Sequence, residues 1–259
     1  MSGAFYRQTD EGRFESSPLT AGPWSADAQH AGPPSALLVR AMEPRTDSSR
    51  LARVSVDVLG PVPIAPLTIE VRQVRPGRSV ELLEATASID GRPALVARGW
   101  RMRTTPDDFP SVGSHAGPGT EDRPRERGPM LPFAHKDGYL SVVDFSFDSG
   151  SGEALGPAAA WGRSRAALVD GETMTGWQHT VVVADSASGI SMATDPMASP
   201  AINCDLVVSL VRDPDVDWVH LDSETVGGPG GGVLTDTRLS DARGRLGRSV
   251  QNLYGRRLG

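Results

Sequence analysis

The chain has 259 residues, enough for one large domain or two of ordinary size, and its hydrophobic share of 38% and charged share of 22% are typical of a soluble globular protein. A net charge of −6 argues against a general nucleic-acid binder, because such proteins usually carry a basic surface. Cys204 is the only cysteine, so no intramolecular disulfide and no cysteine-based metal site can form, and a reducing cytoplasm is the expected compartment.

Two further features favour a cytoplasmic location. The first residues, MSGAFYRQTDEGRF, lack the basic and then apolar pattern of a secretory signal. No apolar run approaches the roughly 20 residues that a membrane-spanning helix needs. We therefore expect no membrane span.

The first part of the chain predicts a helix followed by an antiparallel meander. Residues 5–14 predict a hairpin that turns at residues 9–12. Gly32-Pro33-Pro34 is typical of a helix start, and it predicts a buried helix over residues 35–43 that ends at Pro44. Alternating apolar residues and the Asp90-Gly91 turn then predict four strands, near residues 54–58, 67–72, 80–89 and 94–103.

Residues 104–137 interrupt this pattern. They are rich in proline, glycine and charge and have no hydrophobic periodicity, which is typical of an interdomain linker. The alternative is that the last of these residues fold over a ligand.

After residue 137 the earlier order of elements returns. Trp177–Ile190, WQHTVVVADSASGI, contains three valines that by themselves favour a strand. We nevertheless predict a helix, because the matching place in the first part is a helix and buried helices need not follow propensity. Strands are predicted at residues 142–147, 158–165, 202–211, 218–226, 233–239 and 248–257.

The two parts also end alike. RPALVARGWRMR follows the Asp90-Gly91 turn and GRLGRSVQNLYGRR follows the turn at residues 241–244, about 150 residues later. The sequence therefore predicts an α+β protein with two tandem helix-on-sheet units, residues 1–103 and 138–259, joined by the linker 104–137.

Several polar residues have both a structural and a functional interpretation. Asp185 follows the buried segment VVVA, so it is either a cap that ends the element or a reactive carboxylate that is partly shielded from water. Gln251 and Asn203 could be ordinary strand residues, and His30 could be a cap or a packed histidine. The five histidines show no metal-ligand spacing, and neither a Gly-x-Ser-x-Gly elbow nor a phosphate-binding loop is present, so we predict no metal and no cofactor.

Four segments in this order resemble the acyl-CoA thioesterase II family: GPWSADAQHAGPPSALLVRAM, VVVADSASGIS, INCDLVVSLVRDP and GRSVQNLYGR. The resemblance covers nearly the whole chain apart from the linker. It implies a double hotdog fold, in which each half wraps an antiparallel sheet around one helix. It also implies hydrolysis of an acyl-CoA thioester by a water held by an Asp, a Ser or Thr, and a Gln. By position these are Asp185, Asn203 and Gln251, so Asn203 departs from the family's Ser or Thr.

The chemistry implied by this resemblance assigns a role to each residue. Asp185 would take a proton from the water, and Gln251 and Asn203 would hold that water through their amides. Backbone N–H groups around His30–Gly32, or in the matching place of the other half, would polarise the carbonyl, which makes His30 and Gly32 substrate-binding candidates. The phosphates of CoA could meet Arg98, Arg101, Arg248 and Arg256.

The leading hypothesis is thus an acyl-CoA thioesterase that acts as a homodimer or other homo-oligomer, the assembly being an expectation from the resemblance. Because Asn203 replaces Ser or Thr, a non-catalytic acyl or acyl-CoA binding protein of the same fold is the alternative. An enoyl-CoA hydratase is a third hypothesis, less favoured because the sequence lacks a clear Asp-x-x-x-x-His element.

Overall fold

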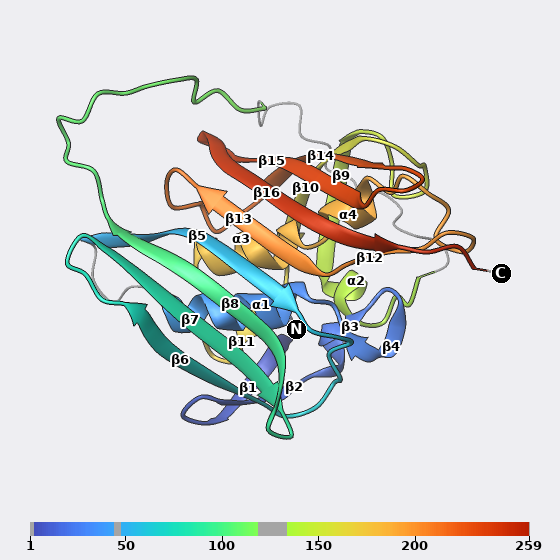
Figure 1. Ribbon diagram of the computed structural model, residues 1–259, viewed down its shortest axis with the longest axis horizontal. Helices are drawn as coiled ribbons and strands as arrows, with labels where there is room; N and C mark the ends of the chain where they lie inside the picture. Colours follow the sequence, from blue (N-terminus) through green and yellow to red (C-terminus); the bar gives the residue numbers. More distant parts are fainter. Residues whose placement is uncertain (1–2, 44–47, 119–133, 259) are drawn as a thin grey trace.

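The computed structural model describes residues 3–43, 48–118 and 134–258 (Figure 1). The first half contains β1 (Ala4–Asp10), β2 (Arg13–Ser16), the short 3-10 helix η1 (Pro18–Thr20), β3 (Ala21–Gly22), β4 (Ser25–Gln29), α1 (Gly32–Met42), β5 (Ser49–Val58), β6 (Leu67–Arg75), β7 (Val80–Ile89) and β8 (Arg92–Arg103). The second half contains α2 (Tyr139–Val142), β9 (Val143–Ser149), β10 (Ala158–Ser164), β11 (Ala167–Val169), α3 (Gly176–Ala184), α4 (Ala187–Ile190), β12 (Ala201–Asn203), β13 (Asp205–Leu210), β14 (Val219–Gly227), β15 (Val233–Asp241) and β16 (Gly244–Gly255).

One large sheet carries both halves, and its strand order repeats. The first half contributes β1-β2-β6-β7-β8-β5 and the second β9-β10-β14-β15-β16-β13, and the two runs meet where β5 pairs antiparallel with β13. The pairs are antiparallel apart from β11, which lies parallel to β1 and so extends the edge of the opposite half. The predicted repeat of a helix-on-sheet unit is confirmed, while the boundaries at residues 103 and 138 stay a prediction.

The strands form where the sequence alternates. In β7, Leu83, Ala85, Ala87 and Ile89 are buried and alternate with partly exposed residues, because successive side chains point to opposite faces of a sheet. Asp90 and Gly91 both have positive φ, 49° and 73°, as a two-residue hairpin turn requires. This turn sets the register in which β7 pairs with β8.

Helix α1 begins three residues earlier than predicted, at Gly32, so Pro33 and Pro34 lie inside its first turn, where no proline N–H is needed. Pro44, predicted to end the helix, lies outside the described residues. Helix α3 confirms the helix prediction for the three valines: all three are buried, and a capping box between Thr175 and Gln178 starts the helix. The segment is not a single helix through Ile190, because α3 ends at Ala184 and α4 is a separate short helix.

The two helices lie side by side on the same face of the sheet and run in opposite directions (Figure 1). A Cβ added to Gly32, at the start of α1, would lie 2.5 Å from the carbonyl oxygen of Val182, near the end of α3. At the other end of the pair, Glu43 follows α1 and accepts hydrogen bonds from Thr175 and Gln178 at the start of α3. At each end of the pair, the C-terminal end of one helix therefore lies next to the N-terminal start of the other.

Several short elements were not predicted. Strands β3, β4 and β11 have two to five residues, and helix α2 has four. Strand β11 depends on a distant partner, β1, whereas β3 and β4 pair with each other, and segments as short as these carry little local signal. The strand predicted over residues 202–211 is also divided at Cys204 into β12 and β13.

Candidate active site

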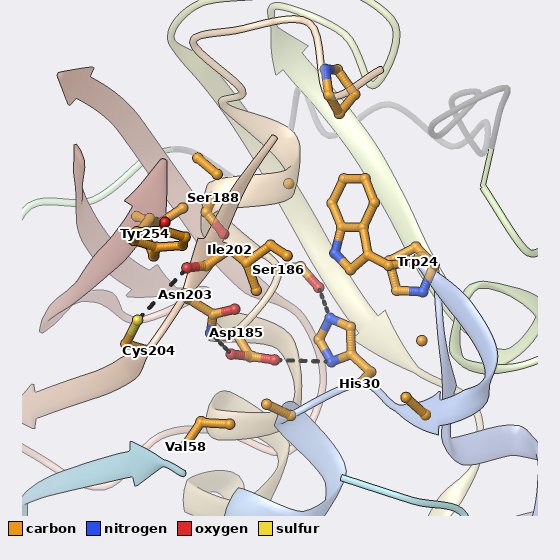
Figure 2. A pocket seen from close by; sticks show the side chains of 18 of the residues that line it. Trp24, His30, Val58, Asp185, Ser186, Ser188, Ile202, Asn203, Cys204 and Tyr254 are labelled. Atoms are coloured by element: carbon orange, nitrogen blue, oxygen red, sulfur yellow. Dashed lines mark hydrogen bonds and ion pairs between the residues drawn. The ribbon is translucent and has the colours of Figure 1, made fainter. Parts of the chain in front are cut away.

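Four of the five predicted site residues come together at one end of the helix pair, and Figure 2 shows three of them, His30, Asp185 and Asn203. Asp185 caps the C-terminal end of α3, Asn203 ends β12, Gln251 lies in β16 and His30 precedes α1. Figure 2 shows His30 and Asn203 on opposite sides of the Asp185 carboxylate. The site therefore draws residues from both halves of the chain.

The Asp185 carboxylate is the centre of this group and is only 6% exposed. Its Oδ1 accepts hydrogen bonds from Asn203 Nδ2 at 2.8 Å and from Gln251 Nε2 at 3.3 Å. Its Oδ2 lies 3.1 Å from His30 Nδ1. The cap interpretation and the functional interpretation of Asp185 are thus compatible, because a helix-end residue can also face three polar side chains.

Gln251 is held at both ends of its amide. Nε2 also donates to the backbone carbonyl of Asp185 at 3.2 Å, and Oε1 accepts from the backbone N–H of Ser188 at 3.2 Å. Because the side chain is buried and each amide atom has a protein partner, Gln251 fixes Asp185 relative to α4.

His30 is oriented by contacts on its face and at both ring nitrogens. It stacks on Tyr139, with ring centroids 3.7 Å apart and an angle of 3° between the planes. The Gly32 N–H donates to Nδ1 at 3.2 Å, and Nε2 lies 3.5 Å from Ser186 Oγ. Burial lowers the pKa of His30, and the nearby charge of Asp185 opposes that shift only in part, so the imidazole is neutral at pH 7.

A cavity of about 600 Å³ opens next to this group and is lined by His30, Asp185 and Asn203. Its remaining wall is largely apolar and includes Val58, Leu59, Val62, Leu140, Met192 and Leu253. An apolar cavity with a few polar groups at one place is the usual form of a small-molecule site. The volume lies within the usual range of such sites.

Other predicted residues lie elsewhere. Gly32 is not part of the cavity wall, and its amide supports His30 instead. The arginines proposed for CoA phosphates do not line this cavity either: the side chains of three of them pair with neighbouring strand carboxylates, Arg98 with Glu84, Arg101 with Glu81, and Arg248 with Asp236, and Arg256 lies near the C-terminus.

Two residues of this group were missed by the sequence reasoning, Tyr139 and Ser186. Tyr139 is fully buried, stacks on His30 and contacts Ser186 through its hydroxyl at 2.8 Å. Ser186 directly follows Asp185 in the sequence, and this adjacency is the signal that could have identified it. Tyr139 gave no local signal, because only the tertiary structure brings α2 to the end of α3.

Within the three described ranges, no group of three or more His, Cys, Asp or Glu side chains could hold a metal ion. The same part of the chain contains no helix with the length and hydrophobicity of a membrane span.

Comparison with known proteins agrees with the fold and with the order of the two halves. The N-terminal domain of acyl-CoA thioesterases matches residues 20–102, and their C-terminal domain matches residues 106–254. Among curated protein sequences, none matches this chain.

Solved structures of the same fold cover nearly the whole chain. A candidate thioesterase from Novosphingobium aromaticivorans is 19% identical, with a TM-score of 0.73 and coverage of 96% of this chain and 97% of its own. A hot dog fold protein of unknown function from Alicyclobacillus acidocaldarius is 16% identical, with a TM-score of 0.72 and coverage of 97% and 96%. An acyl-CoA thioesterase II from Mycobacterium marinum is 16% identical, with a TM-score of 0.66 and coverage of 98% and 95%.

These structural likenesses confirm the predicted hotdog fold. Because the two matched domains together span most of the sequence in the expected order, the chain belongs to the acyl-CoA thioesterase family.

Proposed function

We propose that the protein hydrolyses a fatty acyl-CoA thioester to the free acid and CoA, with a water activated at Asp185. The observation that carries this proposal is the convergence of Asp185, Asn203 and Gln251, with Asn203 2.8 Å from Asp185, beside an apolar cavity. A thioester carbonyl is already activated, so a positioned water can attack it without a covalent enzyme intermediate.

Each side chain has a distinct part in this reaction. Asp185 takes a proton from the water while the water oxygen bonds to the carbonyl carbon. Asn203 donates to Asp185 through Nδ2, which leaves its Oδ1 to accept from the same water. Gln251, whose amide is engaged on both sides, positions Asp185. The carbon–sulfur bond then breaks, and the thiolate of CoA takes up the proton.

The carbonyl oxygen acquires negative charge during the attack and needs a nearby positive potential. Ala31 lines the cavity at the N-terminal end of α1. A helix N-terminus carries a partial positive charge, so this end of α1 can stabilise the developing oxyanion. A cytoplasmic location and a homo-oligomeric state belong to the same proposal.

The proposal is tested by thiol release from a panel of acyl-CoAs of increasing chain length. Asp185→Asn keeps the size of the side chain and its contacts with Asn203 but cannot act as a base. Hydrolysis of the best substrate should fall about 10²- to 10⁴-fold, the usual contribution of a general base. Wild-type release that is no faster than release by Asp185→Asn, for every acyl-CoA, would contradict the proposal.

Asn203 keeps a second function open. A non-catalytic acyl or acyl-CoA binding protein would retain the cavity and lack efficient turnover, because a small displacement of the water costs much rate. Tight binding of a non-hydrolysable acyl-CoA analogue, without turnover of the matching thioester, would favour this alternative.

A further inference from the structure

A chain of hydrogen bonds begins at the last turn of α3. In a regular helix the carbonyl of Val182 would accept from the backbone N–H of Ser186, but that N–H donates to Val183 at 3.0 Å. The Tyr139 hydroxyl donates to the Val182 carbonyl instead, at 2.8 Å. A carbonyl can only accept, so the proton of Tyr139 is committed to this bond.

The direction of the next two contacts follows from counting protons. A phenol has one proton, so the 2.8 Å contact between Tyr139 and Ser186 requires Ser186 to be the donor. Ser186 also has one proton, so it can only accept at the 3.5 Å contact with His30 Nε2. The proton of the neutral imidazole therefore lies on Nε2.

The other ring nitrogen agrees with this assignment. The Gly32 backbone N–H donates to His30 Nδ1 at 3.2 Å, which requires an unprotonated Nδ1. Burial raises the pKa of Tyr139, which keeps the phenol protonated as the chain requires. The stacking of His30 on Tyr139, at 3.7 Å, fixes the ring plane in which both contacts are made.

This tautomer decides what His30 can do for Asp185. Nδ1 lies 3.1 Å from Asp185 Oδ2, and an unprotonated Nδ1 cannot donate to an ionised carboxylate. It can accept a proton from a protonated carboxyl group. The arrangement therefore provides an acceptor for the proton once Asp185 has taken it from the water.

We propose that Tyr139 and Ser186 are positioning residues that hold His30 in its Nε2–H tautomer, so that Nδ1 stabilises the proton that Asp185 removes from water. This inference rests on the proposed hydrolysis. In that step the water O–H bond breaks, its proton moves to Asp185 Oδ2 within reach of Nδ1, and the oxygen bonds to the carbonyl carbon. The same proton leaves later with the thiol.

The tautomer can be measured without any activity. Nitrogen chemical shifts of isotope-labelled histidine distinguish protonated from unprotonated ring nitrogens, and the His30 signals are identified by their loss in His30→Gln. In the wild type we expect a protonated Nε2 and an unprotonated Nδ1. In Tyr139→Phe the Ser186 hydroxyl loses its acceptor and is free to donate to His30 Nε2. The imidazole proton should then lie on Nδ1.

A matched control is Tyr6→Phe. Tyr6 is a second buried tyrosine, but its hydroxyl donates to Gln29 at 2.6 Å. The His30 signals should not change in this variant. A protonated Nδ1 in the wild type, or the same spectrum in Tyr139→Phe as in the wild type, would overturn the proposal even if hydrolysis is confirmed.

Kinetics give a second test, in which a merely structural role predicts the opposite result. Tyr139→Phe should lower kcat roughly tenfold with little change in KM, because an Nδ1–H group donates to the carboxylate and can no longer accept the proton that Asp185 takes from water. Adding Ser186→Ala removes the donor that causes the wrong tautomer, so the double variant should recover most of that loss. If Ser186→Ala lowers kcat further, the two residues support packing alone and the proposal is wrong. If the wild type hydrolyses no acyl-CoA, the proposed function is wrong. The nitrogen chemical shifts of His30 would still determine which tautomer is present.

Discussion

The two ends of the α1–α3 pair have the same plan and different chemistry. At one end the carboxylate of Asp185 follows α3 and faces His30, just ahead of α1. At the other end the carboxylate of Glu43 follows α1 and contacts Thr175 and Gln178 at the start of α3. Burial raises the pKa of Glu43, and a cavity of about 580 Å³ lies beside it. Each end therefore has a carboxylate, buried at Asp185 and partly buried at Glu43, beside a cavity.

The sheet residues behind the two carboxylates are what differ. Gln251 is the eighth residue of β16, and the eighth residue of β8 is Gly99. A Cβ at Gly99 would lie 2.9 Å from Met42 Sδ and 3.0 Å from Leu51 Cδ1, so a side chain at this position would require both neighbours to move. Leu51 lines the Glu43 cavity as Asn203 lines the Asp185 cavity. The two ends therefore share a similar backbone arrangement, but amide side chains from the sheet reach the carboxylate only at the Asp185 end, whereas Glu43 is contacted by Thr175 and Gln178 at the start of α3.

The most direct test of the difference between the two ends is to neutralise each carboxylate in turn. Asp185→Asn should reduce kcat/KM for the best acyl-CoA about 10²- to 10⁴-fold, whereas Glu43→Gln should change it less than about threefold. Thiol release under the same conditions measures both variants. Equal losses would mean that the Glu43 end also carries chemistry.

Buried histidines at the two ends should make different contributions to acid stability. At the Glu43 end, His179 is buried and accepts a hydrogen bond from the Ser164 N–H at 3.0 Å through Nε2, and burial with the nearby Arg163 lowers its pKa to about 4. The unfolded chain, with an ordinary pKa near 6.5, binds more protons between these values, so stability is present above that range and is lost as pH falls through it. The free energy of unfolding should drop by up to about 3 kcal/mol from this residue.

Denaturant unfolding at a series of pH values checks this expectation. His179→Gln should reduce the decrease in the free energy of unfolding between about pH 6.5 and pH 4. His30→Gln should reduce this decrease by a smaller amount, because the charge of Asp185 opposes the lowering of the His30 pKa. A larger effect at His30 than at His179 would contradict the assignment.

The close approach of the two helices can be tested at the Asp185 end. A methyl group at Gly32 would clash with the Val182 carbonyl and would press on His30 Nδ1, 3.0 Å away. Gly32→Ala should lower the free energy of unfolding by about 2 kcal/mol. In α4, Gly189→Ala is the matched control, since a Cβ there meets nothing within 4 Å and alanine favours helix. Equal stability of the two variants would show that the helices can separate at small cost.

The smallest expected effect concerns Asn203. Asn203→Ala removes the 2.8 Å bond to Asp185 and should reduce kcat roughly tenfold. Asn203→Thr restores a hydroxyl that can donate to Asp185 and accept from water, so its rate should stay within about threefold of the wild type. A tenfold gain in Asn203→Thr would instead identify asparagine as a weakened residue and favour the binding-protein alternative.

Much of the fold followed from the sequence alone. Alternation in residues 80–89, the Asp90-Gly91 turn and the two similar closing strands were sufficient for a repeated helix-on-sheet unit, because these signals are local. The helix at the three valines was predicted only by analogy with the first half, since its stability comes from burial and not from propensity.

Only part of the candidate site could be predicted from the sequence. The identities of Asp185, Asn203 and Gln251 came from a resemblance, and their meeting required α3, β12 and β16 to be brought together by the pairing of distant strands. Only the tertiary structure placed Tyr139 and Ser186 against His30 and so fixed the direction of each proton. Hydrogen-bond direction depends on distances between groups up to 156 residues apart, which no local pattern encodes.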